Sequence, residues 1–284
     1  MLQVKDHVVS HETFSIVSCQ ACGFKFTNPR PSESEIGKYY ESEDYIYHSN
    51  KKKGLFLSIF HLVRQFTIRK KVKLINSLVK EATEKAILDY GCGTGEFLNA
   101  CKSNGWITSG IETSDQARNF AQTNFGLHVK NLNQFSEFKE NSFDVITLWH
   151  VLEHVHRLDE ALQNLRKVLK KDGRILIAVP NISSSDSMHY EKFWAALDVP
   201  RHLYHFSPGE MKKLLESNGL KLEKILPMPF DSFYVSLLSE KFKTGRMNFI
   251  SGAFQGLKSN LNSMKNRSRS SSITYLVQRS EKAE

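Results

Sequence analysis

The sequence has few of the features that mark secreted or membrane proteins. Only four cysteines occur among 284 residues, at scattered positions, which excludes the disulfide framework of a small secreted domain. No apolar run approaches the ~20 residues that span a bilayer. The N-terminus also lacks the apolar stretch of a signal peptide. We therefore expect a cytoplasmic protein with no segment inserted in a membrane.

Acidic residues are outnumbered by basic ones. The chain has 39 Lys and Arg against 30 Asp and Glu, a formal net charge of +9. The excess is concentrated in Lys51–Lys53, Arg69–Lys71 and Lys258–Arg269. Aromatic residues do not interleave with these runs, so solvated helix faces explain them better than a nucleic-acid partner does. Hydrophobic residues make up 40% of the chain, enough for a buried core.

Strand-like segments alternate with helices of about a dozen residues over much of the chain. The expected strands are Ala86–Tyr90, Trp106–Glu112, Leu127–Val129, Phe143–Leu148, Arg174–Val179, Leu220–Leu226 and Ile273–Val277. The expected helices are Leu55–Lys80, Glu96–Asn104, Ser114–Asn124, Leu158–Leu169 and one from Ser207 to Asn218-Gly219. This alternation predicts an α/β fold with a parallel sheet covered on both faces.

Two regions stand outside this alternation. Residues 1–34 contain short extended pieces, and a helix is expected to begin at Ser32-Glu33 and to pass through Tyr39-Tyr40. We therefore divide the chain into an N-terminal appendage, residues 1–50, and a main domain, residues 51–284. Residues 228–272 are expected to form an insertion with helical pieces between the last two strands. Lys171-Asp172-Gly173 is expected to form the turn before the fifth strand.

A glycine-rich loop is the most informative segment. Asp89-Tyr90-Gly91-Cys92-Gly93-Thr94-Gly95 lies between a predicted buried strand and a helix, where open α/β sheets bind ligands. Glycines at alternate positions let the backbone approach a ligand without interference from a Cβ atom. The dinucleotide fingerprint requires a glycine at position 96, where Glu96 stands close to any pyrophosphate. Asp89 instead suits a cationic ligand such as S-adenosylmethionine (SAM), which carries an ammonium and a sulfonium group.

An acid follows at the end of the next predicted strand. Glu112 stands 23 residues after Asp89, where a carboxylate can accept hydrogen bonds from both hydroxyls of a ribose. A plain glycine turn without a ligand is the alternative. The coincidence of strand, loop and second-strand acid favours a nucleoside-containing cofactor over that alternative.

These segments resemble the motifs of class I SAM-dependent methyltransferases. Ile87–Gly95 looks like their first motif, and Ile111–Ser114 resembles their second. Phe143–Val155 looks like the fourth-strand motif of the subgroup that includes the ubiquinone-biosynthesis O-methyltransferases. Leu169–Ile177 is similar to the turn before their fifth strand. The resemblance covers about residues 80–227 and implies a Rossmann-like sheet of seven strands, the last one antiparallel.

The resemblance also implies a set of SAM contacts. The methionine end would lie at Asp89 and the glycines, the ribose at Glu112, and the adenine near the loop after the third strand. Tyrosines of the appendage could close over the sulfonium, because aromatic faces favour a cation, or could simply pack on the main domain. The expected contacts are Asp89, Gly91, Cys92, Gly93, Gly95, Glu112, Thr113, Asn131, Leu132, Trp149, Tyr40 and Tyr45.

One cysteine pair has the spacing of a zinc knuckle. Cys19 and Cys22 are separated by two residues, but a structural zinc takes four ligands and the chain supplies one such pair. His7 and His11 could in principle complete a Cys2His2 site. The segment resembles part of a four-cysteine ribbon found in some methyltransferases of this type. We expect a partial ribbon with a reduced pair and no bound metal.

Four histidines are candidates for the acceptor site. His150 and His154 follow the fourth strand, and His202 and His205 follow the fifth, in a segment that resembles a lid motif of the same subgroup. A hydroxyl acceptor needs a base, and a neutral imidazole with a pKa near ~6.5 can accept its proton. His150 is the first choice because it lies closest to the strand end. A purely structural role is the alternative for each histidine taken alone.

The sequence thus predicts a SAM-dependent methyltransferase that acts on a small molecule, through a hydroxyl group. A nucleic-acid or protein methyltransferase that uses the basic surface is one alternative. The Asn-Pro-Pro-Tyr-like signature of amino-group methylation is missing after the fourth strand, where Leu148–Val151 stands. A non-catalytic SAM-binding protein is another alternative, although its glycine loop would be expected to be eroded. An NAD-dependent oxidoreductase conflicts with Glu96. The sequence does not predict an oligomeric state.

Overall fold

The computed structural model describes residues 1–40, 55–79 and 84–280. Its centre is a seven-stranded sheet with the order β10-β11-β8-β7-β4-β5-β6. The strands are β4 (Lys85–Tyr90), β5 (Trp106–Ile111), β6 (His128–Lys130), β7 (Phe143–Trp149), β8 (Leu169–Pro180), β10 (Leu220–Pro227) and β11 (Ser272–Arg279). Strands β4 to β8 pair in parallel, and β11 is antiparallel to both its neighbours. The predicted Rossmann-like fold with an antiparallel last strand is confirmed.

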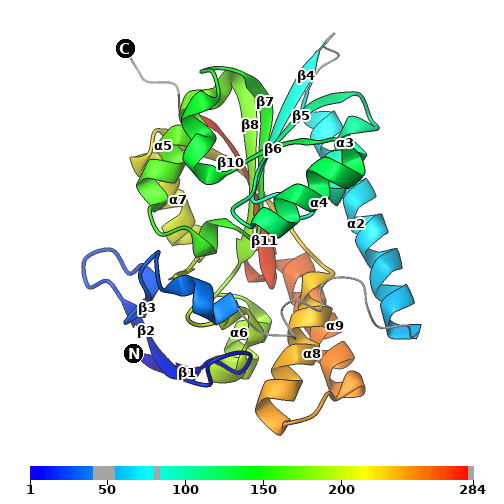
Figure 1. Cartoon of the computed structure of the whole chain (residues 1–284). Helices are drawn as coiled ribbons and strands as arrows, with labels where there is room; N and C mark the ends of the chain where they lie inside the picture. The colour runs from blue at the N-terminus through cyan, green and yellow to red at the C-terminus, as the bar shows by residue number, and fades with distance from the viewer. Residues whose placement is uncertain (41–54, 80–83, 281–284) are drawn as a thin grey trace.

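Helices cover both faces of this sheet (Figure 1). One layer consists of α2 (Leu55–Leu78), α3 (Glu96–Lys102) and α4 (Asp115–Phe125), and the other of α5 (Leu158–Val168) and α7 (Pro208–Ser217). Successive strand residues face opposite layers. Ile87 and Val145 pack with the α2 layer, whereas Leu88 and Ile146 pack with the α5 layer. The central strands are therefore apolar on both faces, as buried parallel strands are.

The fifth parallel strand begins earlier than predicted. The turn expected at Lys171-Asp172-Gly173 is part of β8, which starts at Leu169. Its pairing with β7 shifts register between Phe143 and Val145. An irregularity of this kind accommodates the extra residues of β8 opposite β7, and β8 continues as one strand.

The N-terminal appendage is a second, antiparallel sheet with the order β1-β2-β3-β9. Its strands are β1 (Leu2–Lys5), β2 (Thr13–Ser18), β3 (Lys25–Asn28) and β9 (Tyr204–His205). The expected extended pieces are present, but the fourth strand comes from far outside the expected segment 1–50. The helix expected through Tyr39-Tyr40 is a 3-10 turn, η1 (Ile36–Tyr40).

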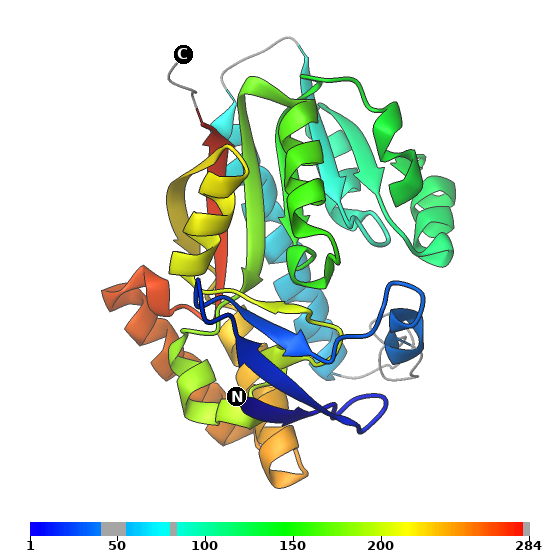
Figure 2. The same cartoon turned by 90° about the vertical axis from the view of Figure 1, so that its left-hand side faces the viewer.

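Two further groups of helices lie with the small sheet at the end of the molecule where the parallel strands finish (Figures 1 and 2). One follows β8 and contains α6 (Ser185–Tyr190), η4 (Glu191–Phe193) and η5 (Ala195–Leu197). The other is the predicted helical insertion, with α8 (Asp231–Thr244), α9 (Phe249–Lys265) and η6 (Arg267–Arg269). Two more 3-10 turns, η2 (Leu132–Glu137) and η3 (Leu152–His154), follow β6 and β7. Among the helices that the structure describes, none has the length and apolarity to cross a membrane.

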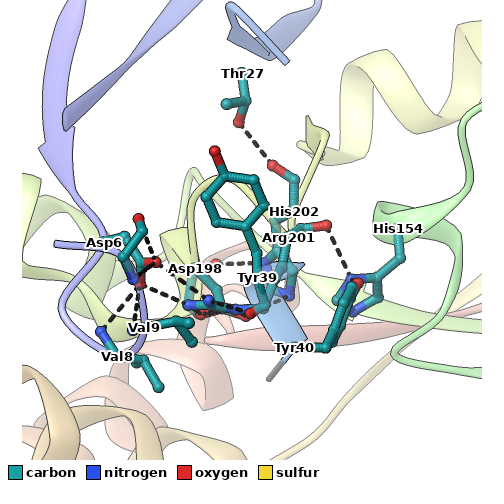
Figure 3. Close-up of polar contacts among 12 residues, drawn as sticks. Asp6, Val8, Val9, Thr27, Tyr39, Tyr40, His154, Asp198, Arg201 and His202 are labelled. Carbon is teal, nitrogen blue, oxygen red and sulfur yellow. Dashed lines mark hydrogen bonds and ion pairs between the residues drawn. The ribbon is translucent and has the colours of Figure 1, made fainter. Parts of the chain in front are cut away.

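A buried arginine joins the small sheet to the loop before β9 (Figure 3). The guanidinium of Arg201 is only 1% exposed, and its Nη2 lies 3.0 Å from Oδ1 of Asp6 and 2.6 Å from Oδ1 of Asp198. Its Nη1 also donates to the carbonyl oxygen of Tyr39 at 2.9 Å. The arginine therefore connects the turn after β1, the turn η1 and the loop that follows η5.

The environment of Asp6 holds its carboxyl ionised. Burial acts to raise its pKa, but the hydrogen bond from Arg201 and then those from the backbone amides of Ser10 and Val8 lower it to about 2. Charge-assisted bonds of this kind are stronger than neutral ones. Below its ordinary pKa of 3.8 this carboxylate loses stabilising power progressively as the pH falls toward about 2.

We expect Arg201→Ala to lower the free energy of unfolding by about 3–5 kcal/mol, because the buried carboxylate of Asp6 and the partly buried one of Asp198 lose their cation. Urea unfolding at pH 7 measures this change. The control is Asp115→Asn, which removes an ion pair with Arg118 whose aspartate is 82% exposed, and should cost at most about 1 kcal/mol. An equal effect of both variants would contradict the structural role of Arg201.

In Asp6→Asn, the part of the acid destabilisation that lies between pH 3.8 and about 2 should be reduced.

Candidate functional site

The glycine loop is closed at its two outer glycines and open at the middle one. The three glycines have φ values of 78°, 55° and 83° at Gly91, Gly93 and Gly95. A Cβ atom at Gly91 would lie 2.4 Å from a methyl group of Val151, and one at Gly95 would lie 2.7 Å from Leu127. A Cβ atom at Gly93 would meet nothing within 4 Å. This open space against the backbone is where a ligand can approach the loop.

The carboxylate of Glu112 borders that space. Its Oε2 accepts a hydrogen bond from the amide of Gly93 at 2.8 Å, and its Oε1 accepts one from the amide of Ser114 at 2.8 Å. Two backbone donors thus fix the orientation of the carboxylate. Each oxygen keeps a further lone pair, so Glu112 can still accept from a pair of ribose hydroxyls.

A buried acid, an aromatic ring and a lysine stand together beside the loop. Asp89 is 3% exposed and accepts a hydrogen bond from the hydroxyl of Thr147 at 2.6 Å. The ammonium of Lys71, on α2, lies 3.9 Å from the centroid of the Trp149 ring and interacts with the carboxylate of Asp89. Burial raises the pKa of Asp89 and lowers that of Lys71. A carboxylate and an aromatic face around a cation are the environment that the positive end of SAM requires.

The loop expected to hold adenine has fewer ligand-binding features than the glycine loop. Oδ1 of Asn131 accepts from the amide of Asn133 and caps η2, so that oxygen already has a partner. Leu132 is 41% exposed and offers an apolar surface next to it. Thr113, another expected contact, is exposed. Burial raises the pKa of the expected contact Cys92, so its thiol stays protonated. The expected contact Tyr45 lies outside the described residues.

His154 lies beside Tyr40 and the backbone of Arg201 (Figure 3). Its Nδ1 is 3.0 Å from the carbonyl oxygen of Arg201 and 3.0 Å from the hydroxyl oxygen of Tyr40. Because a carbonyl oxygen only accepts, Nδ1 carries the proton and Nε2 of the neutral ring carries the lone pair. Burial, and then the neighbouring His202, lower the pKa of His154 to about 4. The ring is therefore neutral at physiological pH.

Glu153 is a buried carboxylate surrounded by histidines. Its side chain is 1% exposed, and among the described residues neither carboxylate oxygen has a hydrogen-bond partner. Burial acts to raise its pKa, but His150, His202 and His154 lower it below the ordinary value. Among the described residues, Glu153, His154 and His202 form the one group of three whose possible ligand atoms lie within 4.8 Å of one another, a spacing that a divalent metal ion could use.

His150 differs from the neutral imidazole that the sequence led us to expect. Its Nε2 lies 3.0 Å from a carboxylate oxygen of Asp231 and its Nδ1 lies 3.5 Å from one of Glu153. Burial acts to lower its pKa, but the hydrogen bond to Asp231, and then the nearby carboxylate of Glu153, raise it to about 10. His150 is thus an imidazolium at physiological pH, and it cannot accept a proton in that form.

The two histidines after the fifth strand are held by the backbone and by the appendage. Nδ1 of His202 lies 2.9 Å from the carbonyl oxygen of Ala196, to which it donates. The hydroxyl of Thr27 donates to the carbonyl oxygen of His202 at 2.7 Å and therefore accepts from Nε2 of His205 at 3.0 Å. Burial lowers the pKa of His205 to about 3. These contacts hold His205 between β3 and β9.

The cysteine pair stands apart from the two N-terminal histidines. Cys19 accepts a backbone hydrogen bond from Gly23 at 2.9 Å and so lies in a tight turn. The ring of His7 stacks on Phe242 with centroids 4.5 Å apart. In the part of the chain that the structure describes, Cys19 and Cys22 do not belong to any group of three or more metal-ligating side chains. The Cys2His2 arrangement considered from the sequence is thus not formed.

Several site residues were missed by sequence reasoning. Lys71 and Asp231 come from α2 and α8, whose positions over the strand ends cannot be read from local patterns. Glu153 stands inside the recognised fourth-strand motif but was assigned no role. A charged residue between two histidines at a strand end was the signal that could have identified it.

An open α/β sheet, a glycine loop with free space at its centre, a second-strand acid and a cation-binding pocket together define a SAM-dependent methyltransferase. A family model described as a methyltransferase domain matches residues 63–225, more than half of the chain. The chain belongs to this family, and its cofactor is SAM.

The chain is also similar to individual proteins and to a solved structure that shares its fold. An uncharacterized protein of Methanocaldococcus jannaschii is 32% identical over 176 residues, which are 60% of this chain and 66% of that protein. The ubiquinone biosynthesis O-methyltransferase of Rickettsia bellii is 25% identical over 210 residues, 68% of this chain and 84% of that enzyme. The structure of a SAM-dependent methyltransferase from Archaeoglobus fulgidus covers 76% of this chain and 94% of that chain, with a TM-score of 0.52 and 20% identity.

We expect Glu112→Ala to weaken the binding of SAM and of S-adenosylhomocysteine by about 1.5–3 kcal/mol, because charge-assisted hydrogen bonds to the ribose are lost. Gly93→Val should abolish binding, because the side chain would fill the open space over the loop. Isothermal calorimetry measures both effects. Glu137→Ala, which removes an exposed partner of Lys130, is the control and should bind normally. A folded Gly93→Val protein that binds SAM would disprove the loop assignment.

His150 should make stability depend on alkaline pH. Its folded-state pKa is raised from 6.5 to about 10, so its stabilising contribution is complete below pH 6.5 and is lost as the pH rises toward about 10. Urea unfolding of the native chain and of His150→Gln should give a difference in free energy that shrinks over this window. The exposed His128→Gln is the control and should show no such trend. A difference that is constant from pH 6.5 to about 10 would contradict the carboxylate pairing.

Proposed function

We propose that the chain methylates a hydroxyl group of a small molecule and that His154 accepts the proton of that hydroxyl. The observation that carries this proposal is the hydrogen bond between Nδ1 of His154 and the carbonyl oxygen of Arg201, which leaves the lone pair on Nε2. The adjacent carboxylate of Glu153 would stabilise the imidazolium that forms. Of the four candidate histidines, His150 is already protonated and His205 is tied to Thr27.

SAM supplies a methyl group on a sulfonium and leaves as S-adenosylhomocysteine. Asp89 and the Trp149 ring would hold its positive end, and Glu112 its ribose. His154 would take the hydroxyl proton as the new bond between the acceptor oxygen and the methyl carbon forms. Displacement would require the acceptor oxygen to lie in line with the departing sulfur, on the far side of the methyl carbon. The imidazolium then returns its proton to water.

Three observations support a small hydroxylated acceptor over the alternatives. Relatives named as ubiquinone biosynthesis O-methyltransferases match about two thirds of the chain. Leu148–Val151 also lacks the signature of amino-group methylation, and this absence counts against nucleic-acid bases as methyl acceptors. The intact loop around Gly93 disfavours a non-catalytic SAM-binding protein.

We expect His154→Gln to retain SAM affinity and to lose roughly 10²–10⁴-fold in turnover once an acceptor is identified. A screen of hydroxylated metabolites with labelled SAM identifies the acceptor, and calorimetry measures cofactor affinity. His128→Gln, on the edge strand β6, is the control and should turn over normally. Normal turnover of His154→Gln would overturn the assignment of the base.

A metal ion among Glu153, His154 and His202 would give the same loss of turnover by a different route. The assay is therefore repeated after exhaustive chelation and after addition of Mg²⁺, Mn²⁺ or Zn²⁺. Turnover that is indifferent to chelation supports His154 as the base. Turnover that vanishes and is restored by one of these ions would assign the group to metal binding instead.

A further inference from the structure

Helix α9 turns its small residues inward. Its buried positions are Gly252, Gly256, Ser259 and Ser263. A Cβ atom at Gly256 would lie 2.7 Å from the ring of Phe233, and one at Gly252 would lie 3.0 Å from the backbone of Leu237. The backbones of α8 and α9 therefore approach closely, and no large side chain fits between them. The apolar side chains of α9 must lie elsewhere.

Those side chains form a stripe on the opposite, exposed face. Every member is at least half exposed, from 50% for Leu257 to 86% for Ile250. At about 100° per residue the five positions fall within about 80° of the helix circumference. The stripe consists of Ile250, Phe254, Leu257, Leu261 and Met264. An amphipathic helix normally turns such a stripe toward the protein core, so in α9 the usual arrangement is reversed.

Positive charge surrounds this stripe. From residue 241 to residue 269 the chain has seven basic residues and no acidic one. The basic residues are Lys241, Lys243, Arg246, Lys258, Lys265, Arg267 and Arg269, all of them exposed. Lys258 and Lys265 follow directly after Leu257 and Met264, so they border the stripe along one side. An apolar stripe with a cationic margin is the composition of a helix that lies in a membrane interface.

We propose that α9 docks the protein on an anionic lipid surface, with the stripe below the headgroups and the cations among the lipid phosphates. A second copy of the chain fits less well, because the two cationic margins would repel each other across the shared face. The narrow, straight stripe also suits a planar partner. Docking of this kind is peripheral and reversible, and no helix has to cross the bilayer.

The docking helix is directly connected to the site. Helix α8, which packs on α9, begins at Asp231, and Asp231 pairs with His150 at 3.0 Å. Figures 1 and 2 show both helices at the end of the molecule where the parallel strands finish. A docked molecule would therefore hold its acceptor site near the lipid surface. This last consequence rests on the proposed function, whereas docking itself does not.

Co-sedimentation of the full chain with vesicles tests the proposal. The protein should bind vesicles of phosphatidylcholine mixed with phosphatidylglycerol, and it should bind pure phosphatidylcholine vesicles much more weakly. Raised salt should weaken the binding, because exposed charges are screened. The variant Phe254→Ser/Leu261→Ser should lose at least ~10-fold in the partition coefficient, because two apolar side chains no longer enter the interface. Lys258→Glu/Lys265→Glu should lose the preference for anionic vesicles.

The matched control is Ile107→Ser/Phe120→Ser, which replaces two apolar side chains on β5 and α4 that are 54% and 38% exposed. It should partition like the native chain. Equal partitioning of the native chain and of Phe254→Ser/Leu261→Ser would overturn the proposal. Light scattering without lipid could instead detect a dimer that this variant converts to a monomer. That result would also overturn the proposal, because the partner on the stripe would then be a second copy of the chain. SAM binding of each variant is measured in parallel, so that failure of docking and failure of the methyltransferase assignment are distinguished.

Discussion

A guanidinium with almost no access to water connects three parts of the chain that are distant in sequence. Arg201 satisfies Asp6, Asp198 and the backbone of Tyr39 at once, and each of these groups belongs to a different segment. A buried charge is costly unless all its partners are in place, so the segments can adopt one relative arrangement only. The carbonyl oxygen of the same arginine fixes the tautomer of His154. The hydrogen-bond state of the proposed base thus depends on the packing of the appendage.

The surroundings of His150 and His154 give the two imidazoles different protonation states. His150 lies between two carboxylates and is charged, whereas His154 lies beside a carbonyl oxygen and another imidazole and is neutral. Glu153 favours the charged form of His150, whose Nδ1 lies 3.5 Å from it, whereas burial and His202 outweigh its effect on the pKa of His154. Environments that push pKa values apart are how one site obtains both a base and a fixed positive charge. The fixed charge of His150 also offsets the negative charge of Asp231.

The parts of the site that local chemistry determines were predictable. The loop around Gly93 and the acid Glu112 follow from a strand, a turn and a second strand, so their places could be read from residue spacing. The protonation of His150 depends on Asp231, which enters from a helix 81 positions later in the chain. Lys71 likewise reaches Trp149 from a helix before the sheet. Such contacts depend on how helices pack over strand ends, and residue patterns along the chain do not encode that packing locally. The extent of β8 was missed because a Lys-Asp-Gly sequence also forms ordinary turns.

The origin of strand β9 has a consequence for synthesis of the chain on the ribosome. Strands β1 to β3 emerge well before β9, yet the hydroxyl of Thr27 bonds to the backbone of His202, 175 positions later. At the usual ~5–20 residues per second, the first strands wait roughly ten to thirty-five seconds for that partner. During this interval the edge of β3 that later pairs with β9 is open to other chains. The small sheet is therefore completed only after most of the central sheet has been synthesised.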